Sequence, residues 1–252
     1  MGNVTGNIDL AQIAIYVFWG FFIGLVVWLR REDHREGYPL EADPGGGIDM
    51  RGSFLIPKPK VYRLRNGETR TVPRFDRDTR PLAARLAAPW PGAPLVPTGD
   101  PLVDGVGPAA WADRPDVPDQ TWDNRDKIVP SRLAPEFYVS NHDPDPTGFP
   151  VIAADNGQAG TVVEIWIDRS EHVVRYLEVD AGGGTGPLLV PMALSKLKGE
   201  TVKVKALLAS QFANAPRIRS AESVTFLEED RIYAYFAGGH LYATPARSEP
   251  LL

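Results

Sequence analysis

The segment from Asp168 to Arg175 concentrates side chains that can carry chemistry. Two carboxylates, Asp168 and Glu171, stand among Arg169, His172 and Arg175. Carboxylates can pass protons to a buried acceptor when burial or neighbouring charges move their pKa toward the working pH. Taken alone, the residue pattern predicts a plainer arrangement, an exposed hairpin loop in which Glu171 pairs with Arg175.

A second charged segment, Gln120 to Pro130, contains Asp123, Asp126 and Lys127. From the pattern alone, a solvated surface loop is the alternative for this segment. No two of the four histidines have the i, i+3 or i, i+4 spacing of a local metal site. The chain also has no cysteine, so the sequence predicts neither a metal site nor a disulfide.

The carboxylates at 168 and 171 lie between two runs of alternating apolar and polar residues, which predict an antiparallel strand pair over 161–179. Further short strands are expected over 186–192, 201–208 and 223–230. This spacing is typical of a small antiparallel barrel. The segment 228–239 is expected to begin as a helical turn and to end at its glycine pair.

The most apolar block runs from Leu10 to Leu29, 20 residues without a charge. At 1.5 Å per residue it forms about 30 Å of helix, enough to cross the hydrocarbon core of a bilayer. Arginines flank only its C-terminal end, which predicts a cytoplasmic C-terminal side and a periplasmic N-terminus. A cleaved signal peptide needs basic residues before the block, and none precedes Arg30; a buried core helix is the other alternative.

The middle of the chain, residues 37–150, contains 19 of the 24 prolines and is expected to be an extended surface segment. Its scattered Trp, Leu, Val and Phe residues favour a coil that packs against another surface over a disordered one. Alternating runs on both sides of Asn66-Gly67 predict a β-hairpin within it.

Composition and motifs exclude several functional classes. The formal net charge of −5 gives no electrostatic basis for binding nucleic acid. The chain also lacks the nucleophile elbow, metal motif and dinucleotide motif of a membrane-anchored hydrolase or oxidoreductase. We therefore expect a protein that is not an enzyme.

Five separated stretches carry a resemblance to a known family. The apolar helix is followed, in order, by RREDHREGYPL, PKPKVYRL, PTGDPLVDGVGPAAW, IWIDRSEHVVRYLEV and FAGGHLYATP. Together they resemble the H subunits of purple bacterial photosynthetic reaction centres, from about residue 8 to residue 247. The resemblance implies a single N-terminal transmembrane helix and a mainly β cytoplasmic domain, with a small antiparallel PRC-type barrel and an extended proline-rich segment.

The same resemblance divides the chain into three parts. Residues 1–36 would form the periplasmic N-terminus and the transmembrane helix. Residues 37–150 would form the proline-rich surface segment with its hairpin, and residues 151–252 the PRC-barrel cytoplasmic domain.

The resemblance implies an accessory role in a light-driven electron-transfer complex. The chain would cap the cytoplasmic face of the L and M subunits, shield the quinone sites from water and assist proton delivery to the secondary quinone. Bacteriochlorophyll, bacteriopheophytin, quinones and non-haem iron are then expected on L and M, with no cofactor bound principally by this chain. Further expected partners are light-harvesting antenna helices and lipids of the intracytoplasmic inner membrane. The alternative is a membrane-anchored PRC-barrel adaptor that binds another partner.

The resemblance also assigns roles to the hairpin loop. Glu171 matches the position of an inner proton-path glutamate, which lies near quinone-side carboxylates of L. Asp168 and Arg175 match flanking positions that tune the charge of Glu171.

The segment 120–130 matches the family region near proton entry. Asp123, Asp126 and Lys127 are the candidates there. This sequence departs from part of the family, because some relatives carry histidines in this segment and this chain has Arg125 instead. Proton entry would then use the two aspartates or another route.

Overall fold

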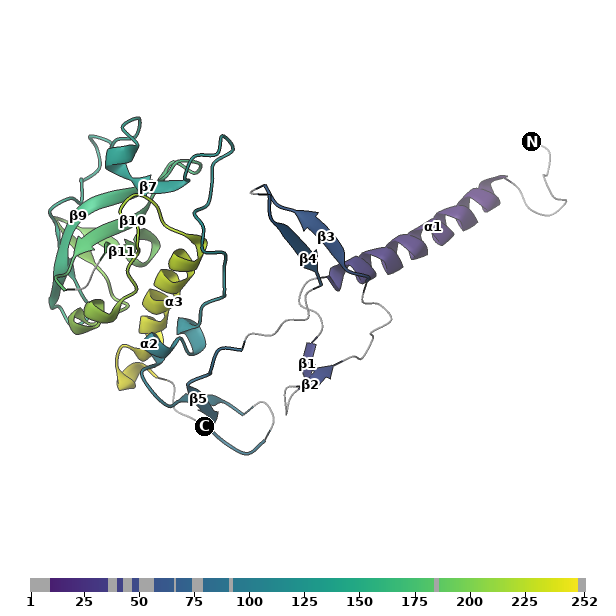
Figure 1. Ribbon diagram of the computed structural model, residues 1–252, viewed down its shortest axis with the longest axis horizontal. Coiled ribbons are helices and arrows are strands. Elements are labelled where there is room, and N and C mark those ends of the chain that lie inside the picture. The colour runs from purple at the N-terminus through teal and green to yellow at the C-terminus, as the bar shows by residue number, and fades with distance from the viewer. Residues whose placement is uncertain are drawn as a thin grey trace. The chain divides into compact units, whose positions relative to one another are not determined.

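The computed structural model describes residues 10–35, 40–42, 47–49, 57–65, 67–73, 79–90, 93–183 and 186–248. Contacts within the chain define two compact units. The first comprises residues 1–80 and 88–93, and the second comprises residues 81–87 and 94–252. The apolar N-terminal helix belongs to the first unit and the large sheet to the second (Figure 1).

The described residues form three α-helices, five 3₁₀ helices and thirteen strands. The helices are α1 (Leu10–Asp33), α2 (Pro101–Asp104), α3 (Phe226–Tyr242), η2 (Gly107–Ala109), η3 (Ser131–Leu133), η4 (Met192–Leu194), η5 (Ala209–Asn214) and η6 (Pro245–Arg247). The strands are β1 (Leu40–Ala42), β2 (Gly47–Asp49), β3 (Lys60–Arg63), β4 (Thr69–Val72), β5 (Ala84–Leu86), β6 (Leu95–Pro97), β7 (Ile128–Pro130), β8 (Pro150–Ile152), β9 (Gln158–Asp168), β10 (Val173–Asp180), β11 (Leu188–Pro191), β12 (Lys196–Lys198) and β13 (Thr201–Lys203).

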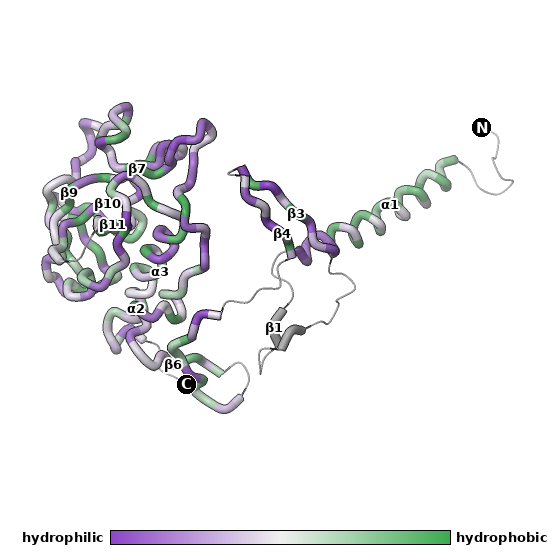
Figure 2. The backbone as a smooth tube through the Cα atoms, in the orientation of Figure 1, coloured by the Kyte–Doolittle hydropathy of each residue, from purple (hydrophilic) through white to green (hydrophobic). Residues whose placement is uncertain are grey.

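Helix α1 has 24 residues, and none of them is buried. It is hydrophobic along most of its length (Figure 2). Within the described part of the chain it is the one helix long and apolar enough to cross a membrane. The predicted apolar helix is therefore confirmed, and its last turn carries Arg30 and Arg31. Its orientation in a membrane stays a prediction.

Ion pairs join the end of α1 to the hairpin formed by β3 and β4. Arg35 donates from Nε and Nη2 to the two carboxylate oxygens of Glu32, at 2.7 and 3.0 Å, and from Nη1 to the carbonyl of Lys58 at 2.8 Å. Lys60 Nζ lies 2.8 Å from Glu32 Oε2. The predicted hairpin is confirmed, and Gly67 adopts a φ of 85° in its turn, a left-handed conformation that suits glycine.

The second unit is built on a seven-stranded sheet with the order β11-β10-β9-β8-β13-β12, and β7 also pairs with β9. All of these pairs are antiparallel except β13 with β8. Trp166, Tyr176 and Leu177 are fully buried at the centre of the core. The mainly β architecture and the 161–179 strand pair are thus as predicted. In the described part of the chain, no pairing joins β11 to β12, so the sheet is not closed.

Helix α3 occupies a segment for which we predicted a strand followed by a short helical turn. The expected strand over 223–230 is wrong, because Thr225 and Glu228 form a capping box: the Thr225 hydroxyl accepts the Glu228 N–H, and the Glu228 carboxylate accepts the Thr225 N–H. These reciprocal hydrogen bonds start a helix at Phe226.

The expected helix end at Gly238 and Gly239 is also wrong, since α3 continues through both residues to Tyr242. Their role is close packing. A Cβ atom on Gly238 would lie 2.5 Å from the Cβ of Ala109, and one on Gly239 would lie 2.5 Å from the carbonyl oxygen of Ala206. Glycine therefore lets α3 approach its neighbours within the second unit.

The proline-rich segment is described continuously from residue 93 to residue 150. Leu102, Ala109 and Ile128 lie in the hydrophobic core of the second unit. This part of the segment therefore packs against a surface, as predicted, but these three residues lie in α2, η2 and β7, so it is not simply the coil that we expected. Because β7 joins the sheet, the sheet begins earlier in the chain than the predicted range 151–252.

Candidate functional site

Asp168 shapes the turn between β9 and β10. Its Oδ1 accepts the backbone N–H groups of Ser170 and Glu171, both at 2.9 Å, and its carbonyl accepts the N–H of His172 at 2.8 Å. The Asp168 side chain is 0% exposed, whereas that of Glu171 is 51% exposed. Asp168 thereby fixes the backbone from which Glu171 reaches the surface.

Two cations converge on the second oxygen of Asp168. Lys127 Nζ lies 3.6 Å and Arg175 Nε 3.8 Å from Asp168 Oδ2. The same cations flank Glu171, with Lys127 Nζ 3.7 Å from Oε1 and Arg175 Nη1 3.6 Å from Oε2. Lys127 Nζ also lies 3.4 Å from Asp119 Oδ2. The predicted pair of Glu171 with Arg175 is present, within a carboxylate cluster of Asp119, Lys127, Asp168, Glu171 and Arg175.

Strand pairing brings the two cations to this point. Ile128 on β7 lies opposite Asp168 on β9, so the preceding residue, Lys127, lies beside the turn. On β10, Val174 and Tyr176 pair with consecutive residues of β9, so Arg175 is the extra residue of a β-bulge. Bulges re-aim a side chain relative to the regular alternation of a strand. Here the bulge turns Arg175 toward Asp168.

The charges of the carboxylate cluster do not cancel, since three carboxylates against two cations leave a formal charge of −1. Burial disfavours the charged form of Lys127, but the charges of Asp168 and Asp119 outweigh it and raise the pKa of Lys127. Burial also disfavours the charged form of Arg175, but the charges of Glu171, Asp168 and Glu229 act together with other acidic neighbours to outweigh burial and raise the pKa of Arg175. Both cations stay charged at neutral pH, so any mobile proton of the cluster resides on a carboxylate.

Asp123 is held in a local network on the entry segment. Thr121 Oγ1 donates to Asp123 Oδ1 at 2.5 Å, and Arg125 Nε donates to Asp123 Oδ2 at 2.7 Å. The hydrogen bond from Thr121, opposed by burial and reinforced by the one from Arg125, lowers the pKa of Asp123. Asp123 therefore remains an anion over the neutral range.

A string of charges connects Asp123 to the turn. Arg125 Nη1 lies 3.8 Å from Glu136 Oε1, and Arg169 Nε lies 4.0 Å from the same oxygen. Arg169 Nη1 also donates to the backbone carbonyl of Asp126 at 3.2 Å. Asp123 thus connects to the turn through Arg125, Glu136 and Arg169, and Asp126 does so through its backbone carbonyl. Lys127 of the same segment is part of the carboxylate cluster itself.

Sequence reasoning missed several residues around the cluster. Asp119 lies just outside the predicted segment, and its carbonyl accepts the Lys127 N–H at 2.8 Å, which closes the local turn. No recognised sequence motif contains an aspartate and a lysine at the spacing of Asp119 and Lys127. The Tyr176 hydroxyl donates to Glu229 Oε2 at 2.7 Å across 53 positions of sequence, a contact that no local pattern signals.

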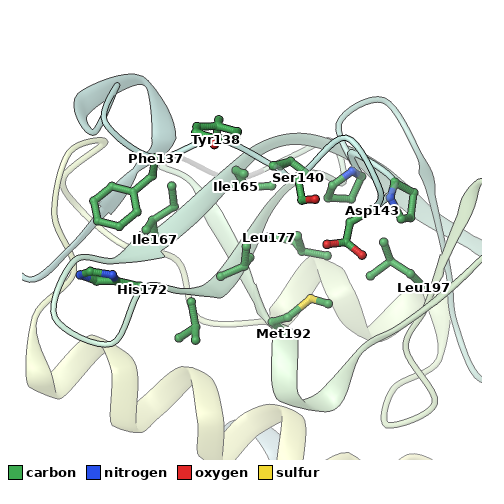
Figure 3. A pocket seen from close by; sticks show the side chains of 15 residues that line it. Phe137, Tyr138, Ser140, Asp143, Ile165, Ile167, His172, Leu177, Met192 and Leu197 are labelled. Carbon is green, nitrogen blue, oxygen red and sulfur yellow. The ribbon is translucent and has the colours of Figure 1, made fainter.

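An apolar cavity of about 550 Å³ adjoins the turn (Figure 3). Phe137 and His172 meet edge to face at one end, with ring centroids 5.2 Å apart. Leu177 and Met192 line its interior, and Tyr138 is 87% exposed.

Two family models match the chain in succession. A model described as the photosynthetic reaction centre, H-chain N-terminal region, matches residues 2–133, which is more than half of the 252 residues. A model described as the PRC-barrel domain matches residues 140–210. The carboxylate cluster draws on both matched regions, because Lys127 lies in the first and Asp168 in the second.

Proposed function

Because the chain belongs to the family of photosynthetic reaction-centre H chains, we propose that it caps the cytoplasmic face of the L and M subunits, shields the quinone sites from water and assists proton delivery to the secondary quinone. The chain is a reaction-centre subunit that associates with the other subunits of that complex, and its single apolar helix fits a single-pass, membrane-associated protein. Its role is accessory. Chlorophyll-type pigments, quinones and iron would lie on L and M, and antenna helices and lipids would surround α1.

The observation that carries the proton-delivery role is the pairing of a fully buried Asp168 with a half-exposed Glu171 in a cluster of net negative charge. A quinone that takes up two electrons also needs two protons, and a site shielded from water receives them through protonatable side chains. Glu171 can exchange a proton with solvent or with a partner carboxylate. Negative charge on a nearby reduced quinone would raise the proton affinity of such a carboxylate.

Exposed apolar side chains of the second unit support the capping role. Tyr138 and Trp122 are each 87% exposed, and Val173, directly after the turn, is 44% exposed. Large aromatic side chains this exposed are uncommon on a surface that faces only water. A partner subunit that covers the apolar cavity would also place Glu171 close to that partner.

The test is Glu171→Gln in the whole reaction centre. Loss of the titratable group should slow the proton-coupled transfer of the second electron to the secondary quinone about tenfold or more. Primary charge separation should be unchanged, because its pigments would belong to L and M. Glu222→Gln, on an exposed loop, serves as the matched control. Unaltered second-electron kinetics across roughly pH 6 to 9 would leave Glu171 as an ion-pair partner only.

A further inference from the structure

Glu229 and Tyr176 form a hydrogen-bonded pair next to the carboxylate cluster. The Tyr176 hydroxyl on β10 donates to Glu229 Oε2 on α3 at 2.7 Å. Tyr176 is fully buried, and the ring of Tyr233 packs edge to face against it with centroids 5.7 Å apart. Tyr176 directly follows the bulged Arg175, so the pair and the cluster are adjacent in the fold.

Only the carboxylate of this pair can exchange a proton near neutral pH. Burial, with the Glu229 charge adding to it, raises the pKa of Tyr176, and burial also raises the pKa of Tyr233. Both phenols therefore keep their protons. Burial raises the pKa of Glu229 as well, although the hydrogen bond from Tyr176 favours the ionised form and limits the rise.

The charges that act on Glu229 belong to the cluster. Arg175 on β10 and Lys127, which precedes β7, favour its ionised form, and Asp119 in the same segment disfavours it. The two cations that flank Glu171 thus also act on Glu229. Because Asp119 is a carboxylate of the cluster, a change of charge at Asp119 changes the field at Glu229.

We propose that Glu229 is a second proton-binding site of this chain, positioned by the Tyr176 hydroxyl and coupled to the carboxylate cluster through Arg175 and Lys127. The proton comes from water and binds to one carboxylate oxygen of Glu229, while Tyr176 keeps its own proton and continues to donate to Oε2. Uptake removes one negative charge beside Arg175, and release restores it. The physiological use of this site rests on the proposed proton delivery, but proton binding and coupling are properties of the chain alone.

The experiment is an infrared pH titration of the carboxylic C=O stretch in the full-length chain in detergent. The wild type should show a carboxyl group that protonates above the usual glutamate range, and Glu229→Gln should remove it. Tyr176→Phe deletes a donor to the charged form, so the midpoint should move up by about one pH unit. Arg175→Gln should also move it up. Glu222→Gln, on the exposed loop, should leave this titration unchanged.

Glu229→Asp keeps a carboxyl group but withdraws it from Tyr176, so it should retain a titrating group with a raised midpoint even where Glu229→Gln folds poorly. An unchanged titration in Glu229→Gln, or an unchanged midpoint in folded Tyr176→Phe, would overturn the proposal. Since the titration needs no quinone, its outcome is independent of the Glu171 test in the complex. A negative result in the Glu229 titration would not affect the proposal for Glu171, and a negative result for Glu171 would not affect the proposal for Glu229.

Discussion

Replacement of Asp168 by asparagine isolates the charge at the centre of the cluster. The amide has nearly the shape of the carboxylate, and its oxygen can still accept the N–H groups of Ser170 and Glu171. What disappears is the anion that faces Lys127 and Arg175. Their distances to Asp168 Oδ2, 3.6 and 3.8 Å, allow ion pairs but are longer than direct hydrogen bonds.

The expected loss of stability follows from those distances and from the burial. One unit-charge pair at about 4 Å contributes about 4 kcal/mol at an effective dielectric constant of about 20. Desolvation of the buried carboxylate, which costs several kcal/mol, offsets much of two such attractions. The side chains of Lys127 and Arg175 are 19% and 33% exposed, so water takes up part of their charge when the anion is gone. We expect Asp168→Asn to lower the free energy of unfolding by about 2 to 3 kcal/mol.

Denaturant unfolding of the full-length chain in detergent measures this effect, as a lower midpoint with an unchanged slope. Asp168→Ala also removes the acceptor of two backbone N–H groups and should lose about 2 kcal/mol more. Glu171→Gln is the control, because an ion pair this exposed contributes at most about 1 kcal/mol. The reasoning would be refuted if Asp168→Asn were no more destabilising than Glu171→Gln.

Three further predictions concern topology, metal sensitivity and helix capping. Protease added to sealed vesicles with the cytoplasmic face outward should digest the chain beyond Arg30, and full protection of the C-terminal domain would reverse the predicted orientation. Micromolar zinc should barely slow light-induced proton uptake, because no group of three or more His, Asp or Glu within the described residues can hold a metal and Arg125 donates a hydrogen bond to Asp123. Strong inhibition by zinc that Asp123→Asn abolishes would contradict this prediction. Thr225→Ala should lower the free energy of unfolding by about 1 kcal/mol, because it removes the N-cap of α3, whereas the control Thr147→Ala on an exposed turn should not. Equal midpoints of denaturant unfolding for the two variants would exclude the capping contribution.

The sequence alone determined the elements whose signals are local. The uncharged block from Leu10 to Leu29 predicted α1, because length and hydropathy are properties of a single segment. Alternation over 161–179 predicted the hairpin of β9 and β10 and its polar turn, because the two-residue period of a strand can be recognised within one short segment. The apolar residues of 223–230 predict a strand, and this is wrong because the Thr225-x-x-Glu228 spacing, which our prediction did not use, starts a helix there.

The grouping of the charged residues depends on the tertiary structure. The hairpin sequence did not indicate that Asp168 is buried and Glu171 exposed, since both are acids in one polar turn. Lys127 reaches them because β7 pairs with β9, and Arg175 does so because a bulge interrupts the alternation of β10. The contact of Tyr176 with Glu229 depends on where α3 lies against the sheet. Register, bulges and helix placement are set by the packing of the whole core, and this is why residues far apart in the chain acquire a common electrostatic environment that no local pattern encodes.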